Sequence, residues 1–400
     1  MSNSLLTPTA VTREALRILH QKLNFVGNIN RTYDDSFANS GAKIGDSLKI
    51  RLPNEYTVRT GANLSTQATT ETSTTLQVAT QKGVDVSFSS AELTLSLDDF
   101  SSRILEPAMS VLAANIEADA LTMYQDVYNI VDQDGTAFSW NTVLNGRKVL
   151  NDNLTPMDNQ RAALLSTGSS VKLVDALKGL FQDSTEIGKQ YREGKMGRSA
   201  GFDFYENTLL VPHTTGTAAK TTGYTVNGAV TANGSTAVTV QTGSTTFKKG
   251  DIFTVAGCFR VHPETKVSTG VLQTFVVTAD YVGGAGSLSF APAIYTSGGR
   301  QNVTAGGLPN SGALVKVGAG NGELINADMV FHKDAFAFAT ADLIMPKGVD
   351  FASRQVLDGI SMRIVRQYAI STDTMPCRID VLYGYKAIRP QLAARLHADG

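Results

Sequence analysis

Charged side chains are scarce in this 400-residue sequence. Lys, Arg, Asp and Glu together make up 18% of the residues, and the formal net charge is -1 at pH 7. Proteins that bind nucleic acid or anionic membranes generally carry a basic field or a basic patch. The sequence therefore predicts no general attraction to polyanions, and any such contact is expected to be local.

Cysteines and long apolar runs are also rare. Cys258 and Cys377 lie far apart and match no metal-ligand spacing, so a reducing compartment is the simpler expectation. The N-terminal segment MSNSLLTPTAVTREAL lacks the basic stretch and apolar core of a secretion signal. No apolar run is long enough to span a bilayer. We therefore expect a soluble cytosolic product without a membrane segment.

Residues that could carry catalysis form no recognisable group. The five histidines are scattered, none has a second histidine at helical spacing, and no GxSxG motif is present. The glycine clusters at 283–286 and 318–322 lack the GK[ST] ending of a phosphate-binding loop. Asp132–Gly135 lacks the later ligands of a calcium loop. The sequence therefore predicts no cofactor, no metal site and no enzymatic activity.

One basic run stands out from this pattern. Lys189, Arg192, Lys195 and Arg198 are separated by glycines, which is typical of an exposed loop. Such a loop could contact phosphate or an acidic neighbour. A merely solvated loop is the simpler interpretation, because only Tyr191 offers an aromatic surface on which bases could stack.

The longest helical pattern covers Leu97–Val131. Its apolar residues recur mostly at three- and four-residue steps, the spacing of one helix face: Phe100, Ile104, Leu105, Met109, Leu112, Ile116, Leu121, Tyr124 and Val127. Pro107 is expected at a kink or in the first turn, since a proline inside a helix removes a backbone hydrogen bond. Glu117, Asp119 and Asp126 fall on the opposite face, which is therefore predicted to be exposed.

The N-terminal region predicts a short helix and an arm. An apolar stripe precedes a segment rich in turn-forming residues, and its members are Val11, Ala15, Ile18, Leu19 and Leu23. A helix followed by an extended arm suggests docking onto a neighbour, and a mobile terminus is the equal alternative.

Residues 41–95 predict a long hairpin. Leu48, Ile50 and Leu52 alternate with polar residues, and a second alternating segment runs from 76 to 88. The stretch between them, 60–75, has almost no large apolar residue. A hairpin with so little core needs another surface to lie on, and a flexible surface loop is the alternative.

The remaining chain predicts a mixed unit that contains an all-β insertion. Helical patterns over 138–156 and 171–181 flank a buried strand at 161–165, which indicates an α/β or α+β unit. From 223 to 318, short strands rich in Val, Thr and Phe alternate with Asn-Gly, Gly-Gly and Gly-Ser turns, as in an inserted barrel or sandwich. Mixed structure returns after 319, and QLAARLHADG is expected to form a short tail after the last strand.

Four segments carry a resemblance to a known family: LAANIEADALTM (112–123), GFDFYENTLLVP (201–212), FKKGDIFTVAG (247–257) and PCRIDVLYGYKAIRP (376–390). They resemble the spine helix, the strand before the insertion, the insertion domain and the C-terminal strand of tailed-bacteriophage major capsid proteins. These proteins share the Hong Kong 97-like fold. The likeness is greatest to the insertion-domain coat proteins of the short-tailed Salmonella phage group.

The resemblance implies an α+β chain of six parts. These are an N-terminal helix and arm (1–40), an E-loop hairpin with P-domain strands (41–95), a spine helix (96–132), a first A-domain part (133–222), an inserted β-barrel-like domain (223–318), and an A-domain return with C-terminal P-domain strands (319–400). It also implies a structural subunit that assembles as hexamers and pentamers into the icosahedral head of a double-stranded DNA phage. The shell would form as a procapsid in the host bacterial cytoplasm and mature on genome packaging into the virion capsid.

The resemblance further implies particular partners and contacts. The partners are further copies of the chain, a separate scaffolding protein, a portal protein and weakly held double-stranded DNA, while a decoration protein stays open. Candidate residues for subunit or phosphate contacts are Arg51, Arg59, Lys189, Arg192, Lys195 and Arg198. Two departures matter. The loop Asn227–Ser235 carries no charge, so the charged twofold-contact loop of the family is not carried over. No coiled coil precedes the arm, which is why scaffolding is expected from a separate protein.

Three alternatives remain open from the sequence. A cellular nanocompartment shell of the same fold would enclose an enzyme instead of DNA, although the inserted β-domain argues against it. A carbohydrate-active or adhesive protein would fit residues 223–318, but it normally brings a secretion signal or an acidic pair. An uncharacterised enzyme would need a polar cluster that the sequence does not display.

Overall fold

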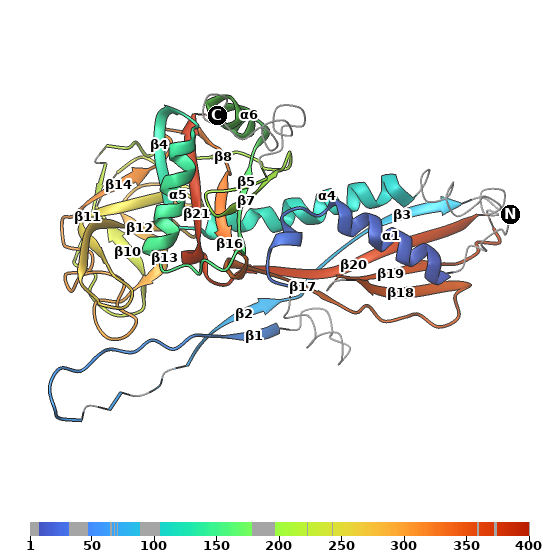
Figure 1. Ribbon diagram of the computed structural model, residues 1–400, viewed down its shortest axis with the longest axis horizontal. Coiled ribbons are helices and arrows are strands. Elements are labelled where there is room, and N and C mark those ends of the chain that lie inside the picture. The colour runs from blue at the N-terminus through green and yellow to red at the C-terminus, as the bar shows by residue number, and fades with distance from the viewer. Residues whose placement is uncertain are drawn as a thin grey trace. The chain divides into compact units, whose positions relative to one another are not determined.

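The computed structural model describes residues 8–31, 47–64, 66–67, 69, 71–88, 105–177, 197–221, 223–241, 243–357, 360–371 and 374–399 (Figure 1). The chain forms two compact units. Unit 1 comprises Met1–Arg51, Ser73–Thr122 and Phe336–Ile388, and unit 2 comprises Leu52–Thr72, Met123–Ala335 and Arg389–Gly400. Each unit combines segments that lie far apart in the sequence. Both contain helices and strands, so the predicted α+β class is confirmed.

Unit 1 packs helices on an antiparallel sheet. Its elements are α1 (Pro8–Lys22), the 3-10 helix η1 (Val26–Asn28), α4 (Glu106–Leu121), β3 (Thr80–Phe88), β17 (Phe336–Ala341), β18 (Phe351–Leu357), β19 (Ile360–Arg366) and β20 (Met375–Ala387). The long strand β20 pairs with β3, β17 and β19, and β18 extends the sheet beside β19. Helix α1 packs against α4, β18 and β19 (Figure 1). The predicted stripe explains this contact, because Ala15 and Leu19 are fully buried.

Helix α4 is shorter than the sequence pattern predicts. It begins at Glu106, has Pro107 in its first turn and ends at Leu121. The 3-10 helix η5 (Thr122–Asp126) follows it. The prediction of one helix from 97 to 131 is therefore wrong after Leu121, and residues 97–104 lie outside the described residues. The apolar residues after Leu121, among them Tyr124 and Val127, are buried outside this helix. Their spacing therefore resembles a helical stripe although they do not belong to the helix.

The segment after α1 is part of the core of unit 1. Phe25 and Val26 are fully buried, and the Phe25 ring meets the Phe336 ring edge-on at 5.5 Å. The backbone N–H of Asn30 donates to Phe336 O at 3.1 Å, and the N–H of Phe338 donates to Asn30 O at 3.0 Å. The prediction of an arm, which began at Asn28, is therefore wrong for residues 28–31, because Asn30 pairs with β17. Residues 32–46 lie outside the described residues.

The predicted hairpin is present. Strand β1 (Ser47–Leu52) pairs with β2 (Thr72–Gln77) in a two-stranded sheet. The second predicted strand is divided, because β3 begins at Thr80 and joins β20 instead. Every residue from 53 to 64 is exposed, so the tip has no core of its own.

Unit 2 contains a mixed six-stranded sheet in the order β4-β21-β16-β5-β7-β6. Its strands are β4 (Ile130–Ala137), β5 (Arg161–Leu165), β6 (Arg198–Ser199), β7 (Phe202–Glu206), β16 (Met329–His332) and β21 (Ala393–Asp399). Helix α5 (Trp140–Asp152) packs on β4, β16 and β21, and α6 (Thr167–Leu177) follows β5. Gly146 permits the close approach of α5, because a Cβ there would lie 2.8 Å from Leu396 Cδ2. Two short 3-10 helices complete the unit, η6 (Lys333–Ala335) and η7 (Pro390–Leu392).

Two predictions about this unit are wrong. The segment QLAARLHADG is no tail, because β21 pairs antiparallel with β16 and parallel with β4. The helical pattern over 171–181 also predicts the wrong apolar face for α6, because it places Val171, Val174, Leu177 and Phe181 on the buried side. Val171 is 68% exposed, whereas Leu173 is fully buried.

The inserted β-domain is a closed sheet. Its strands are β9 (Tyr224–Thr225), β10 (Ser235–Val240), β11 (Ile252–Val261), β12 (Ser268–Val277), β13 (Gly286–Ile294) and β14 (Ala313–Val317), in the order β10-β13-β12-β11-β14-β9. The two edge strands meet through the bridge Val226↔Val240, which closes the sheet as in a small barrel. Phe253, Phe275 and Phe290 fill its centre, with ring centroids 5.0 to 6.1 Å apart. The predicted all-β insertion is therefore present.

Candidate assembly site

The hairpin exposes large apolar side chains although its tip is rich in polar residues. Tyr56, Val58 and Leu64 are 55%, 95% and 84% exposed. Full burial of one aliphatic side chain on another molecule would contribute roughly 1.5–3 kcal/mol. Exposed apolar groups gathered on one extended segment are typical of a contact surface.

Side chains replace a strand ladder within the hairpin tip. The Gln67 amide oxygen accepts hydrogen bonds from the backbone N–H and the hydroxyl of Thr57, both at 2.9 Å. The Gln67 amide nitrogen donates to Thr57 O. Arg59 donates to the carbonyl oxygens of Gly61 and Asn63. The bonds of Gln67 hold the two limbs together where β1 and β2 no longer pair, and those of Arg59 shape the turn between the limbs.

Two carboxylates of α4 hold other parts of unit 1. Glu117 is 1% exposed, and it accepts hydrogen bonds from the backbone N–H groups of Phe25 and Val26. Asp119 accepts one from the Tyr383 hydroxyl at 2.5 Å and forms an ion pair with Lys82 at 2.7 Å. The prediction that the acidic face of the helix is exposed is therefore wrong at Glu117. This helix is buried on two faces because α1 covers the second one.

The inserted domain joins unit 2 through a polar neck. Strand β8 (His213–Thr214) pairs with β15 (Leu324–Ile325), so the incoming and outgoing segments lie side by side. Asp251 is buried there, and its Oδ1 lies 2.8 Å from His213 Nε2. Its Oδ2 accepts hydrogen bonds from the backbone N–H groups of Gly216 and Lys248, both at 2.9 Å. One carboxylate thus ties both sides of the neck.

Arg395 in β21 is the other organising group near the neck. It is 1% exposed and donates to Gly250 O at 2.7 Å and Gln125 O at 3.0 Å. Its guanidinium carbon lies 5.3 Å from the centre of the Tyr124 ring. Burial lowers the pKa of Arg395 to about 10. Two carbonyl groups and an aromatic face stabilise the cation, although its buried Nε has no hydrogen-bond partner among the described residues.

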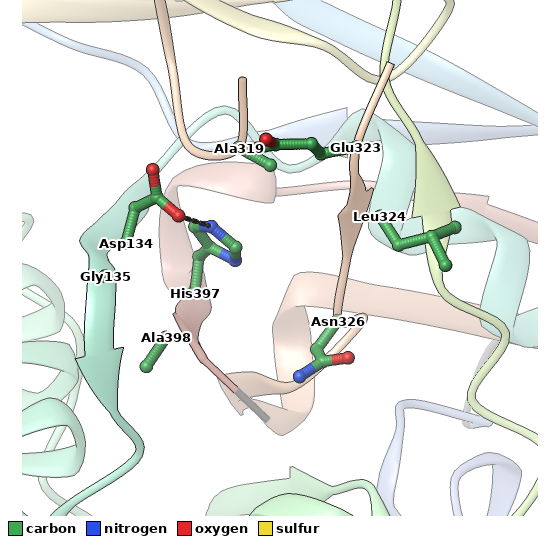
Figure 2. Close-up of a pocket in the computed structure, with 8 residues that line it drawn as sticks. All are labelled: Asp134, Gly135, Ala319, Glu323, Leu324, Asn326, His397 and Ala398. Atoms are coloured by element: carbon green, nitrogen blue, oxygen red, sulfur yellow. Dashed lines mark ion pairs between the residues drawn. The ribbon is translucent and has the colours of Figure 1, made fainter. Parts of the chain in front are cut away.

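A polar pocket of about 540 Å³ opens beside the neck. Figure 2 shows Asp134 and His397 together on one side, with Glu323, Leu324 and Asn326 opposite. His397 Nε2 lies 3.5 Å from Asp134 Oδ1, and neither ring nitrogen has a hydrogen-bond partner among the described residues. The hydrogen bond from Lys220 lowers the pKa of Asp134 against an opposing effect of burial.

The chemistry of this pocket is limited. No group of three potential metal-ligating side chains occurs in the described part of the chain. The pocket also presents no pair of nucleophile and base in hydrogen-bond contact. The nearby carboxylate of Asp132 makes structural contacts, since it forms an ion pair with Lys220 and accepts a hydrogen bond from the Gly318 N–H at 3.1 Å.

Three of the six predicted contact residues lie in the described part of the chain. Arg51 lies on β1, and Arg59 lies in the hairpin tip. Arg198 lies in unit 2, where it donates to Asn159 Oδ1 at 2.8 Å and lies 3.6 Å from Asp203. Lys189, Arg192 and Lys195 lie outside the described residues.

Three residues that hold separate segments together were not predicted from the sequence. Glu117, Asp251 and Arg395 are charged, and charged residues in single sequences are normally assigned to the surface. Their partners are backbone groups that lie remote in sequence. Among these three, only Asp251 could have been noticed in the sequence, because it ends the turn Lys248–Asp251 directly before a strongly apolar strand.

None of the helices in the described residues combines the length and apolarity that a bilayer crossing demands. The sequence model of the P22 coat protein family, described as gene protein 5, matches residues 9–395. The chain belongs to this family. As a coat protein, it is a non-enzymatic structural subunit that assembles with further copies into the icosahedral capsid of a bacteriophage virion.

The solved structures that are similar to this coat protein include several from phages. That of Mycobacterium phage Che8 shares 12% identity, covers 93% of this chain and 90% of its own, and has a TM-score of 0.45. The bacteriophage PhiM1 mature capsid shares 9% identity over 91% and 84%, with a TM-score of 0.39. The CUS-3 coat protein I-domain shares 24% identity, covering 24% of this chain and 96% of its own, with a TM-score of 0.20. No curated protein matches. The family match carries the assignment.

Proposed function

We propose that the hairpin Ser47–Gln77 is the main lapping element between coat protein subunits. The supporting observation is its exposed apolar set of Tyr56, Val58 and Leu64, which has no core within the tip. In a closed shell the same contact repeats around every rotation axis, so modest contacts add up. Arg51 and Arg59 lie on the same hairpin and would add polar contacts to the neighbouring copy.

We propose that these contacts build hexamers and pentamers in the host bacterial cytoplasm. A separate scaffolding protein would guide a procapsid, a portal protein would occupy one vertex, and genome packaging would mature the shell. The six-part division into arm, E-loop, spine, A-domain, inserted domain and P-domain belongs to the same proposal. Packaged DNA would be contacted weakly, since a net charge of -1 gives no general attraction to phosphate. Among the predicted basic residues, Lys189, Arg192, Lys195 and Arg198 would make such contacts.

The experiment compares two hairpin variants, Val58→Asp and Thr60→Asp. Both positions are exposed, so both monomers should fold normally. Val58→Asp places a charge in the proposed apolar contact and should reduce shell formation at least about tenfold, because one tenfold step corresponds to only about 1.4 kcal/mol. Assembly is measured by sedimentation and negative-stain microscopy, with and without the scaffolding protein. Shells that form equally well with both variants would contradict the proposal.

A further inference from the structure

The first limb of the hairpin tip touches a loop of the inserted domain in the same chain. The backbone of Glu55 lies so close to Gly299 that a Cβ on Gly299 would be 2.4 Å from Glu55 O and 2.8 Å from Glu55 C. Gly299 does not adopt a positive φ, so its backbone conformation is open to other residues. The close approach of the hairpin is therefore what requires glycine at this position.

The loop that receives the hairpin is built by the inserted domain itself. Asn233 Oδ1 accepts a hydrogen bond from Thr296 N at 2.8 Å, and Thr296 Oγ1 donates to Thr231 O at 2.9 Å. Arg300 donates to the Tyr295 hydroxyl at 2.8 Å, and its guanidinium carbon lies 4.4 Å from the centre of the Tyr295 ring. None of these bonds involves the hairpin, so the loop has its shape before the hairpin arrives.

The hairpin meets this loop with both of its limbs. Pro53, Glu55 and Gln67 line a cavity of about 300 Å³ together with Tyr295 and Arg300. Gln67 also bonds to Thr57, so the two limbs are tied to each other at the point of contact. Burial lowers the pKa of Lys266, and the Glu55 carboxylate opposes this effect by electrostatic attraction. The hairpin is therefore also attracted to the inserted domain through Glu55 and Lys266.

We propose that the loop Tyr295–Arg300 is a seat that fixes the direction in which the hairpin leaves its own subunit. The inserted domain then sets the angle at which one copy meets the next, and with it the curvature of the shell. This inference rests on the proposed lapping role, because the direction of the hairpin matters only if its tip contacts another copy.

The test measures the position of the hairpin in the monomer. Spin labels are placed at Leu64→Cys and Val282→Cys, which are 84% and 85% exposed, while the native Cys258 and Cys377 are buried. The parent protein should give one narrow distance distribution. Gly299→Leu should broaden or shift it, because the side chain would collide with Glu55. Gly306→Leu is the matched control, since a Cβ there meets nothing within 4 Å.

An unchanged distribution in Gly299→Leu, or a broad one in the parent protein, would overturn the seat. Shells of Gly299→Leu should spread over more diameters than those of Gly306→Leu, and unchanged diameters despite a shifted hairpin would overturn the curvature role. The two proposals fail separately. Normal assembly of Val58→Asp would reject the lapping role while the distance measurement still decides the seat.

Discussion

The carboxylate of Glu117 accepts a hydrogen bond from the backbone N–H of Val26 at 3.2 Å, across a sequence separation of 91 residues. The same carboxylate accepts the N–H of Phe25. Helix α4 thereby fixes the segment that follows α1. An acidic residue that the helical pattern assigns to the surface thus serves as an internal cap for a remote turn.

Replacing Glu117 should destabilise the monomer. Glu117→Ala leaves two buried backbone donors without their acceptor, which should cost about 2–4 kcal/mol of unfolding free energy. Chemical denaturation measures this loss. Asn115→Ala, at an exposed position of the same helix, is the control and should change stability by less than about 0.5 kcal/mol. A Glu117→Ala protein as stable as the control would show that the carboxylate contributes nothing.

Ile116→Asp should prevent folding altogether. Ile116 is fully buried, so the substitution places a carboxylate in an apolar interior without a partner. Circular dichroism and the soluble yield measure the outcome, with Asn115→Asp as the matched surface variant. A soluble Ile116→Asp protein that unfolds cooperatively would mean that the buried face of α4 is wrongly assigned.

The Asp134–Lys220 pair should stabilise the neck in a pH-dependent way. The Lys220 hydrogen bond lowers the pKa of Asp134 below its usual value of 3.8, so the contribution is present above that pH and is lost as the pH falls further. His397 and Asp132 face the same pair. Both partners are about one-third exposed, so Lys220→Gln should cost only about 0.5–1 kcal/mol at pH 7.

Denaturation of the parent protein and Lys220→Gln at several pH values tests this pair. The difference in unfolding free energy should shrink at acidic pH and in high salt. A difference that stays constant from neutral to strongly acidic pH would show that the ion pair is not its source.

The two cysteines should resist alkylation in the folded protein. Burial raises the pKa of Cys258 to about 12 and that of Cys377 to about 11. At pH 8, thiolate fractions would then be on the order of one in ten thousand and one in a thousand. Mass spectrometry after maleimide treatment should find modification only in denatured protein. Rapid labelling of the native protein would place at least one thiol at the surface.

Sequence patterns predicted those helices and strands whose buried face can be recognised from residues close together in the sequence. The stripe of α1 and the alternation in β1 each need only one covered face, and the Asn-Gly and Gly-Gly turns separate the strands of the inserted domain. The assembly hairpin was also predicted from its polar tip. Its exposed Tyr56 and Val58 were not singled out, because a sequence does not show which apolar residues lack a partner.

Other features depend on contacts between remote segments. Tyr128 falls inside the predicted helical pattern Leu97–Val131, yet it lies after the helix and packs against Ile252 and Val276. Strand β21 contains Arg395 and His397, which resemble surface residues, although both are almost fully buried. Gly299, where the hairpin approaches the loop, looks in the sequence like any other glycine of a turn.

The position of β21 has a consequence for how the subunit is made. This strand lies between β4 and β16 in the sheet of unit 2, and unit 1 likewise joins the segment after α1 to β17. Unit 2 cannot complete its sheet until Ala393–Asp399 has been synthesised, and unit 1 needs residues 336–387 to pair with segments near its start. Such distant pairings form slowly. A chain that stops before Ala393 therefore leaves β4 and β16 without the strand that lies between them.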